Sequence, residues 1–190
     1  MPPTPTETLH PPLHRALACA VHAAHAPGAV ACIGDTDSIL HLDAFGLQQC
    51  TPHQTPTHTD TLYDLASLTK VIATTTAVML LFEQGRLDLD EPIGTRLGVG
   101  EPVPYTPRRL LTHTAGLPAT VDWYHELHGL AAYVEKISTL GAQPTIPPRR
   151  LYSDLGFMLL AQLVTVLTNR PLDQFCQTHI FEPLGMNNTF

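Results

Sequence analysis

The chain has 190 residues, of which 44% are hydrophobic and 14% are charged, and its formal net charge is −7. This length and composition predict a soluble, globular protein with a sizeable core and exclude a disordered chain. Basic residues are few and scattered, so we expect no nucleic-acid partner. No apolar run reaches the roughly 18 residues of a membrane span. The best run, at 71–82, is interrupted by Thr74, Thr75 and Thr76.

The N-terminus contains no basic segment followed by an apolar one, so no secretory signal is visible and we expect a cytoplasmic location. The four cysteines form no C-x-x-C pair, which favours reduced thiols over a disulfide framework. Several of the 11 histidines have helical spacing, such as His10 with His14, but no H-E-x-x-H motif accompanies them. We therefore predict no metal site.

The first part of the chain predicts a helix followed by a hairpin. Pro11 and Pro12 are placed to open the helix, and Pro27 with Gly28 is placed to end it. Short runs rich in Val, Ile and Leu, separated by turn residues, predict two antiparallel strands. The predicted elements are a helix at 13–26, strands at 29–33 and 38–45, and an irregular connection at 48–60.

The second part predicts a long central helix and then a block of helices. Residues 67–84 are apolar over most of the helix circumference, and Gly85 is placed to end this helix. The further elements are a loop at 88–107 and helices at 106–112, 129–140, 153–168 and 171–179. We divide the chain into 1–60, the helix and two-strand part of an α/β domain, and 61–190, the central helix with the helical domain. Two strands alone are marginal, so the sheet is expected to be incomplete.

A serine and a lysine stand three residues apart at the start of the central helix, in Ser67-Leu68-Thr69-Lys70. On a helix this spacing puts the hydroxyl and the amine on one face. We expect the helix N-terminus and burial to lower the pKa of Lys70, so that its amine can accept the serine proton. The Ser67 backbone N–H would help to bind an oxyanion. The alternative is an ordinary N-cap serine beside a solvated lysine.

Five segments resemble, in the same order along the chain, the penicillin-recognising serine hydrolases, and most closely their class C β-lactamase and esterase branch. They span nearly the whole chain, and the joint match is specific. The segments are 62–70 (LYDLASLTK), 83–92 (EQGRLDLDEP), 109–117 (RLLTHTAGL), 152–157 (YSDLGF) and 181–186 (FEPLGM). The resemblance implies a β-lactamase/transpeptidase-like α/β fold, here with an incomplete antiparallel sheet and a helical domain.

The resemblance also implies roles for single residues. It makes Ser67 the nucleophile and has Lys70 and Tyr152 manage its proton, although Tyr152 could instead be a packed aromatic at a helix start. His113 corresponds to a structural loop position and is left out of the catalytic set. Asp154, a candidate substrate-binding residue, replaces the commoner Asn. Its carboxylate accepts hydrogen bonds only and would hold Lys70 protonated, which slightly favours esters over amides.

One element of that family has no match here. Neither Lys-Thr-Gly nor His-x-Gly follows Tyr152, and the strand that carries it normally supplies the second oxyanion N–H. We therefore expect a truncated chain that lacks the C-terminal sheet strands and exposes an apolar patch beside the strands at 29–33 and 38–45.

Two functions remain open at this point. One is hydrolysis of a small-molecule ester or amide through an acyl-enzyme, as in an esterase, β-lactamase or D,D-peptidase, without cofactor or metal. The other is a non-catalytic remnant or binding module that retains the Ser-Lys-Tyr cluster. The sequence leaves the oligomeric state open.

Overall fold

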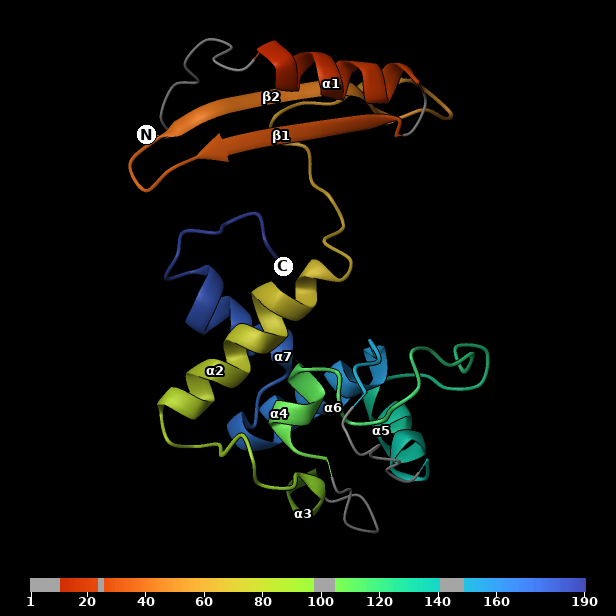
Figure 1. The fold of residues 1–190 in the computed structure, drawn as a ribbon, viewed down its shortest axis with the longest axis vertical. Helices are drawn as coiled ribbons and strands as arrows, with labels where there is room; N and C mark the ends of the chain where they lie inside the picture. The colour runs from red at the N-terminus through yellow and green to blue at the C-terminus, as the bar shows by residue number, and fades with distance from the viewer. Residues whose placement is uncertain (1–10, 24–25, 98–104, 141–148) are drawn as a thin grey trace. The chain divides into compact units, whose positions relative to one another are not determined.

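The computed structural model describes residues 11–23, 26–97, 105–140 and 149–190. The chain divides into two compact units, 1–64 and 65–190. In the first unit, strand order β1-β2-β3 gives an antiparallel sheet, and helix α1 lies across the hairpin (Figure 1). The elements of this unit are α1 Pro11–His22, β1 Gly28–Gly34, β2 Ile39–Gln49 and β3 Thr55–Pro56.

Local chemistry explains the hairpin turn. The Asp35 carboxylate accepts hydrogen bonds from the backbone N–H groups of Asp37 at 2.9 Å and Ser38 at 2.8 Å, and these bonds lower the pKa of Asp35. Helix α1 is tied to β2 where His14 Nδ1 lies 2.7 Å from Asp43 Oδ2. The predicted helix and strands are present, but the helix is assigned only to His22, and β2 continues to Gln49.

The connection predicted as irregular at 48–60 contains the short strand β3, which pairs with β2. The apolar patch expected beside the hairpin stays a prediction, because the apolar side chains of these strands are mostly half-buried. Phe45 of β2 is buried, and no large apolar side chain of β1 or β2 is exposed. Packing of α1 on the hairpin gives one reason, since the His14 ring meets the Phe45 ring edge-on with centroids 5.0 Å apart.

In the second unit the central helix predicted at 67–84 consists of two parts with different helical geometry. Its first part is a π-helix, and an α-helix follows without a gap. Gly85 ends the helix at a φ of 67°, a left-handed conformation that favours glycine, as predicted. The elements of this unit are η1 Lys70–Thr75, α2 Thr76–Glu83, α3 Gly94–Leu97, α4 Pro107–Leu111, α5 Leu130–Ser138, α6 Asp154–Thr168, α7 Leu172–Cys176 and η2 Gln177–Phe181.

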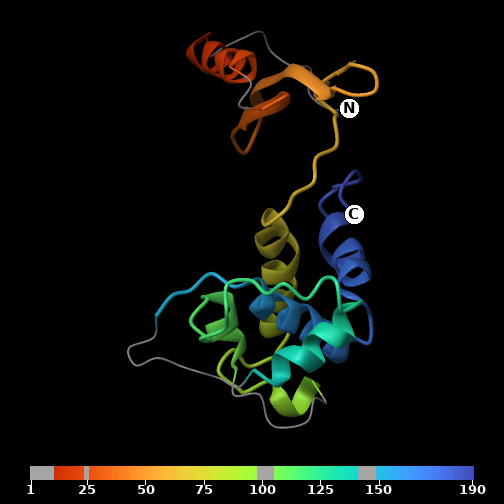
Figure 2. The ribbon, with the colours of Figure 1, turned by 90° about the vertical axis from the view of Figure 1, so that its right-hand side faces the viewer.

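Helix α6 forms the centre of this unit. It contacts α2, α3, α4, α5, α7 and η1, and Leu159, Leu160, Leu163 and Val164 are fully buried along it. Figure 2 shows η1 and α2 running beside α7 and η2, and the close contacts between these helices agree. The helices predicted at 106–112, 129–140 and 153–168 are confirmed as α4, α5 and α6.

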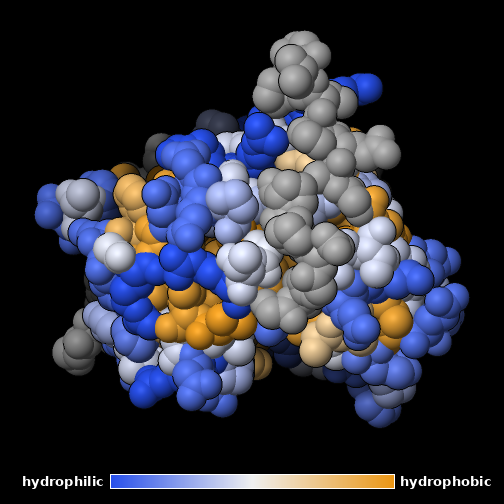
Figure 3. Space-filling model, turned by 90° about the horizontal axis from the view of Figure 1, so that it is seen from below, coloured by the Kyte–Doolittle hydropathy of each residue, from blue (hydrophilic) through white to orange (hydrophobic). Residues whose placement is uncertain are grey.

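The expectations for 88–107 and 171–179 change in part. The first segment contains the short helix α3, and its residues 98–104 lie outside the described part. The helix predicted at 171–179 continues as η2 to Phe181. On the face in Figure 3, hydrophobic side chains lie in patches between hydrophilic ones. No single helix in the described part is long and apolar enough to cross a membrane, although α6 with the segment 172–181, bent by 69°, has the length and composition as a pair.

Candidate active site

Ser67 lies in the turn that opens the central helix. Ala66, directly before it, has a φ of 45°, which is uncommon for a residue with a side chain. Such conformations persist where the surroundings fix them, and they cluster at functional sites. The N–H groups of Leu68 and Thr69 donate to the carbonyls of Leu65 and Ala66 at 2.9 and 3.1 Å, which closes the turn around the serine.

Lys70 is the first residue of the π-helix η1. The Thr75 hydroxyl donates to the Lys70 carbonyl at 2.7 Å, and the Thr76 hydroxyl donates to the Val71 carbonyl at 3.0 Å. These bonds reach five residues back and support the wider turn. π-Helical turns are rare and are frequent at functional sites. Lys70 Nζ donates to Ser67 Oγ at 3.2 Å, so the predicted proximity of the two groups is present.

Tyr152 and Asp154 reach the same point from the start of α6. Lys70 Nζ lies 2.7 Å from Asp154 Oδ1, and Tyr152 lies close enough to Lys70 and Ser67 for interactions with both to lower its pKa. Lys70 Nζ also lies 5.1 Å from the centroid of the Tyr152 ring and 5.8 Å from that of Phe157. The structure therefore brings all four sequence-predicted residues together. Sequence reasoning did not single out Phe157.

The charge of Lys70 agrees with the expectation that Asp154 holds it protonated and differs from the expectation that burial lowers its pKa. Burial of the Lys70 amine opposes its protonation, but the hydrogen bonds with Asp154 and Tyr152 outweigh burial, and the pKa of Lys70 is raised above 10.5. The predicted fall in this pKa was wrong, because the interactions with Asp154 and Tyr152 together outweigh burial, although burial is the largest single contribution. The hydrogen bonds with Lys70 and Ser67 lower the pKa of Tyr152 below 10.0, although burial opposes this.

Backbone hydrogen bonds join the Tyr152 segment to the 113–119 loop. The N–H of Leu151 donates to the His113 carbonyl at 2.8 Å, and the N–H of Asp154 donates to the Ala119 carbonyl at 3.2 Å. The buried Ser153 hydroxyl donates to the Pro118 carbonyl at 2.6 Å. Ser153 therefore fastens the loop and does not cap α6 with its side chain. The sequence predicts an ordinary N-cap for a serine at this position, so the bond of Ser153 to the loop could not be predicted from it.

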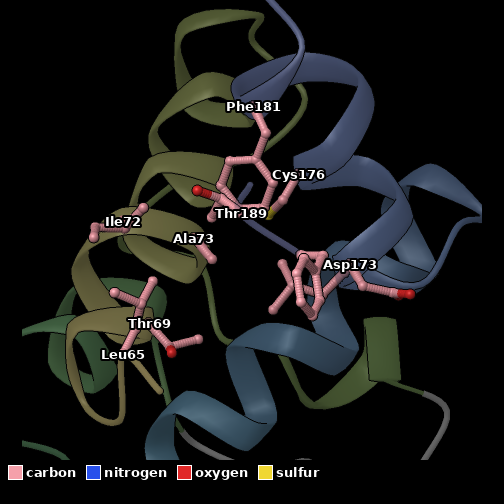
Figure 4. Close-up of a pocket in the computed structure, with 10 residues that line it drawn as sticks. Leu65, Thr69, Ile72, Ala73, Asp173, Cys176, Phe181 and Thr189 are labelled. Atoms are coloured by element: carbon pink, nitrogen blue, oxygen red, sulfur yellow. The ribbon is translucent and has the colours of Figure 1, made fainter. Parts of the chain in front are cut away.

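A cavity of about 150 Å³ lies beside the nucleophile turn, from which Leu65 and Thr69 line it (Figure 4). Its walls are mostly apolar, and none of the four site residues lines it. The lining residues are Leu65, Thr69, Ile72, Ala73, Leu172, Asp173, Cys176, Phe181, Thr189 and Phe190. Within the described part of the chain, no group of three or more His, Cys, Asp or Glu residues could hold a metal ion.

Comparison with protein-family models matches residues 13–190 to the family described as Beta-lactamase. The chain belongs to the β-lactamase family. Its curated relatives include an N-acetylmuramyl-L-alanine amidase of Bacillus subtilis, 30% identical, and penicillin-binding protein 4* of the same organism, 31% identical. The matches cover 88% and 80% of this chain but 43% and 35% of those proteins, so the chain spans less than half the length of either.

Solved structures share the fold of this chain. A class C β-lactamase of Rhodobacter sphaeroides matches with a TM-score of 0.72 at 27% identity, covering 90% of this chain and 48% of that one. FmtA of Staphylococcus aureus matches with a TM-score of 0.79 at 17% identity over 99% of this chain and 54% of that one, which shows the fold alone. The predicted family and the β-lactamase/transpeptidase-like fold are confirmed.

Proposed function

We propose that the protein is a serine hydrolase that forms an acyl-enzyme on Ser67. The observation that carries this proposal is the contact of Lys70 Nζ with Ser67 Oγ at 3.2 Å, in a site where Lys70 Nζ also lies 5.1 Å from the centroid of the Tyr152 ring. A nucleophile, a proton acceptor and a fixed cation within hydrogen-bond reach are what acyl transfer requires. Membership of the β-lactamase family supports the same chemistry.

The charges assign the proton to Tyr152. Lys70 is paired with Asp154 at 2.7 Å and is an ammonium at neutral pH, so it has no lone pair with which to accept the serine proton. Tyr152, as the phenolate that its lowered pKa favours, accepts the proton and becomes a neutral phenol as Ser67 Oγ bonds to the substrate carbonyl carbon. The proton then passes from Tyr152 to the leaving oxygen or nitrogen, and water later cleaves the ester on Ser67. We expect the Ser67 N–H to donate to the developing oxyanion.

The substrate we propose is a small ester or amide, with esters favoured. Related proteins are named D-alanyl-D-alanine carboxypeptidase and D-amino acid amidase, which supports small acyl compounds as a class. Asp154, paired with Lys70, offers acceptors only and cannot donate to a substrate carbonyl as an asparagine could. Its side chain is 41% exposed, so part of it faces solvent and an incoming substrate.

One observation favours a second candidate, a non-catalytic remnant or binding module. No Lys-Thr-Gly or His-x-Gly follows Tyr152 in these residues, so a second oxyanion donor of that type is missing from them. An oxyanion donor is worth roughly 10²–10³-fold in kcat. A chain without one would keep the Ser-Lys-Tyr cluster but turn over slowly.

Covalent labelling separates the two candidates. We expect incubation with a p-nitrophenyl ester, followed by intact-mass measurement, to show one acyl adduct on wild-type protein and none on Ser67→Ala. Ser38→Ala is the matched control, since Ser38 lies in an exposed turn of the other unit, and it should label like wild type. A folded wild-type chain that forms no adduct would favour the non-catalytic candidate.

A further inference from the structure

His113 touches the chain on both sides of Tyr152. Its carbonyl accepts a hydrogen bond from the Leu151 N–H at 2.8 Å, and its ring Nδ1 accepts one from the Ser153 N–H at 3.0 Å. Its ring also packs on the Tyr152 ring, with centroids 4.5 Å apart and an angle of 34° between the planes. Three consecutive residues that include the proposed proton acceptor are thus held by one side chain and its backbone.

The hydrogen bond to Ser153 defines the form of the imidazole. Because Nδ1 accepts a backbone N–H, the ring is neutral and its proton lies on Nε2. An imidazolium could not accept this bond. Burial of the ring, followed by the positive charges of Arg150 and Lys70, lowers the pKa of His113, while Asp154 acts in the opposite direction. The neutral form is therefore the one present at neutral pH.

The backbone of His113 is in an uncommon conformation. Its φ is 58°, in the left-handed region, and its N–H donates to the Leu110 carbonyl at 3.1 Å at the end of α4. The ring itself is buried between Tyr152 and Phe157, whose centroid lies 5.2 Å from it. Conformations of this kind persist only where the surroundings fix them. Here they direct Nδ1 at the N–H next to Tyr152.

We propose that His113 is a positioning residue, whose Nδ1 holds the Tyr152 segment so that the tyrosine hydroxyl faces Ser67 and Lys70. The inference rests on the proposed function, in which Tyr152 accepts the serine proton. Tyr152 itself is 46% exposed, so packing around its side chain alone does not fix its orientation. The bond from His113 to the neighbouring Ser153 N–H supplies that restraint.

Two substitutions distinguish the effect of the hydrogen-bond acceptor of His113 from the effect of its ring packing. His113→Asn keeps an acceptor close to the position of Nδ1 and tolerates the left-handed φ, whereas His113→Phe keeps the ring and leaves the Ser153 N–H without a partner. Loss of the acceptor should lower kcat for ester hydrolysis by about tenfold or more in His113→Phe, with KM nearly unchanged, while His113→Asn stays within a few-fold of wild type.

A second readout does not depend on turnover. The tyrosinate absorbance of Tyr152, obtained by subtracting the titration of the corresponding Tyr152→Phe protein, should appear at higher pH in His113→Phe and at the wild-type pH in His113→Asn. An unchanged titration in His113→Phe, with only a lower Tm, would overturn the proposal and leave His113 structural. A shift in both variants would overturn the role of Nδ1. If neither the wild-type protein nor the variants form an acyl-enzyme, the proposed function fails. The titration of Tyr152 still shows whether His113 positions the tyrosine.

Discussion

At the scale of single residues, the Lys70 ammonium is shared between two oxygens, Ser67 Oγ at 3.2 Å and Asp154 Oδ1 at 2.7 Å. The shorter contact is with the carboxylate, which holds the ammonium protonated. This arrangement makes Lys70 a fixed positive charge beside the nucleophile, and it leaves Tyr152, whose pKa is lowered, as the group that we expect to exchange the proton.

Asp154→Asn tests what the carboxylate does. The amide supplies a donor for a substrate carbonyl and removes the charge that holds Lys70 protonated. A neutral hydrogen bond is worth about 0.5–1.5 kcal/mol, so kcat/KM for a chromogenic β-lactam should rise roughly two- to tenfold relative to that for a short-chain ester. Steady-state kinetics on both substrates and both proteins checks this. An unchanged ratio would show that Asp154 does not face the substrate.

The pH dependence of acylation should follow Tyr152 and Lys70. Because the pKa of Tyr152 is lowered, kcat/KM for an ester should rise with pH through a limb below pH 10.0 and fall only above pH 10.5, where Lys70 loses its proton. Lys70→Ala removes the hydrogen bond that lowers the tyrosine pKa, so the rising limb should move to higher pH. Rates are measured against buffer blanks. A limb at the same pH in Lys70→Ala would contradict the assignment.

At the scale of elements, α6 connects the site to the core. Its first residue, Asp154, pairs with Lys70, and its middle is buried against most of the other helices of the unit. The core of α6 therefore holds the site in place, because a shift along this helix would move Asp154 away from Lys70.

Leu163→Ala should lower the free energy of unfolding by about 2–5 kcal/mol, since Leu163 is fully buried and its loss leaves a cavity. Val166→Ala on the same helix is the control. Its side chain is 43% exposed, so the change should stay within roughly 0.5 kcal/mol. Urea unfolding followed by circular dichroism measures both. Equal effects of the two substitutions would contradict the central position of α6.

At the scale of the whole molecule, the two units differ in thiol exposure. All four cysteines are free. Cys19, Cys32 and Cys50 of the first unit are exposed, whereas Cys176 of the second is buried, and burial, with a smaller effect of Asp173, raises the pKa of its thiol to about 11. Alkylation with iodoacetamide should therefore modify three thiols in the native protein and the fourth only after unfolding. Peptide mass mapping identifies them, and early modification of Cys176 would show that the second unit opens readily.

The sequence alone determined those features that depend on neighbouring residues. Proline marked the start of α1 and glycine the end of the central helix, and the three-residue spacing brought Ser67 and Lys70 together on one turn. Hydrophobic periodicity located α6. The resemblance added Tyr152 and Asp154, whose catalytic and binding roles remain predictions.

Only the tertiary structure decided the charge of Lys70 and the surroundings of Tyr152. Burial and a helix N-terminus favour a lower pKa of Lys70 and the Asp154 carboxylate favours a higher one, and the sequence does not show which effect is larger. In the structure the interactions with Asp154 and Tyr152 together outweigh burial, so the pKa is raised. The contact of His113 with Ser153 likewise joins segments far apart in the chain. Local spacing cannot predict such contacts, because their energies depend on distances of a few ångströms that only the packed helices define.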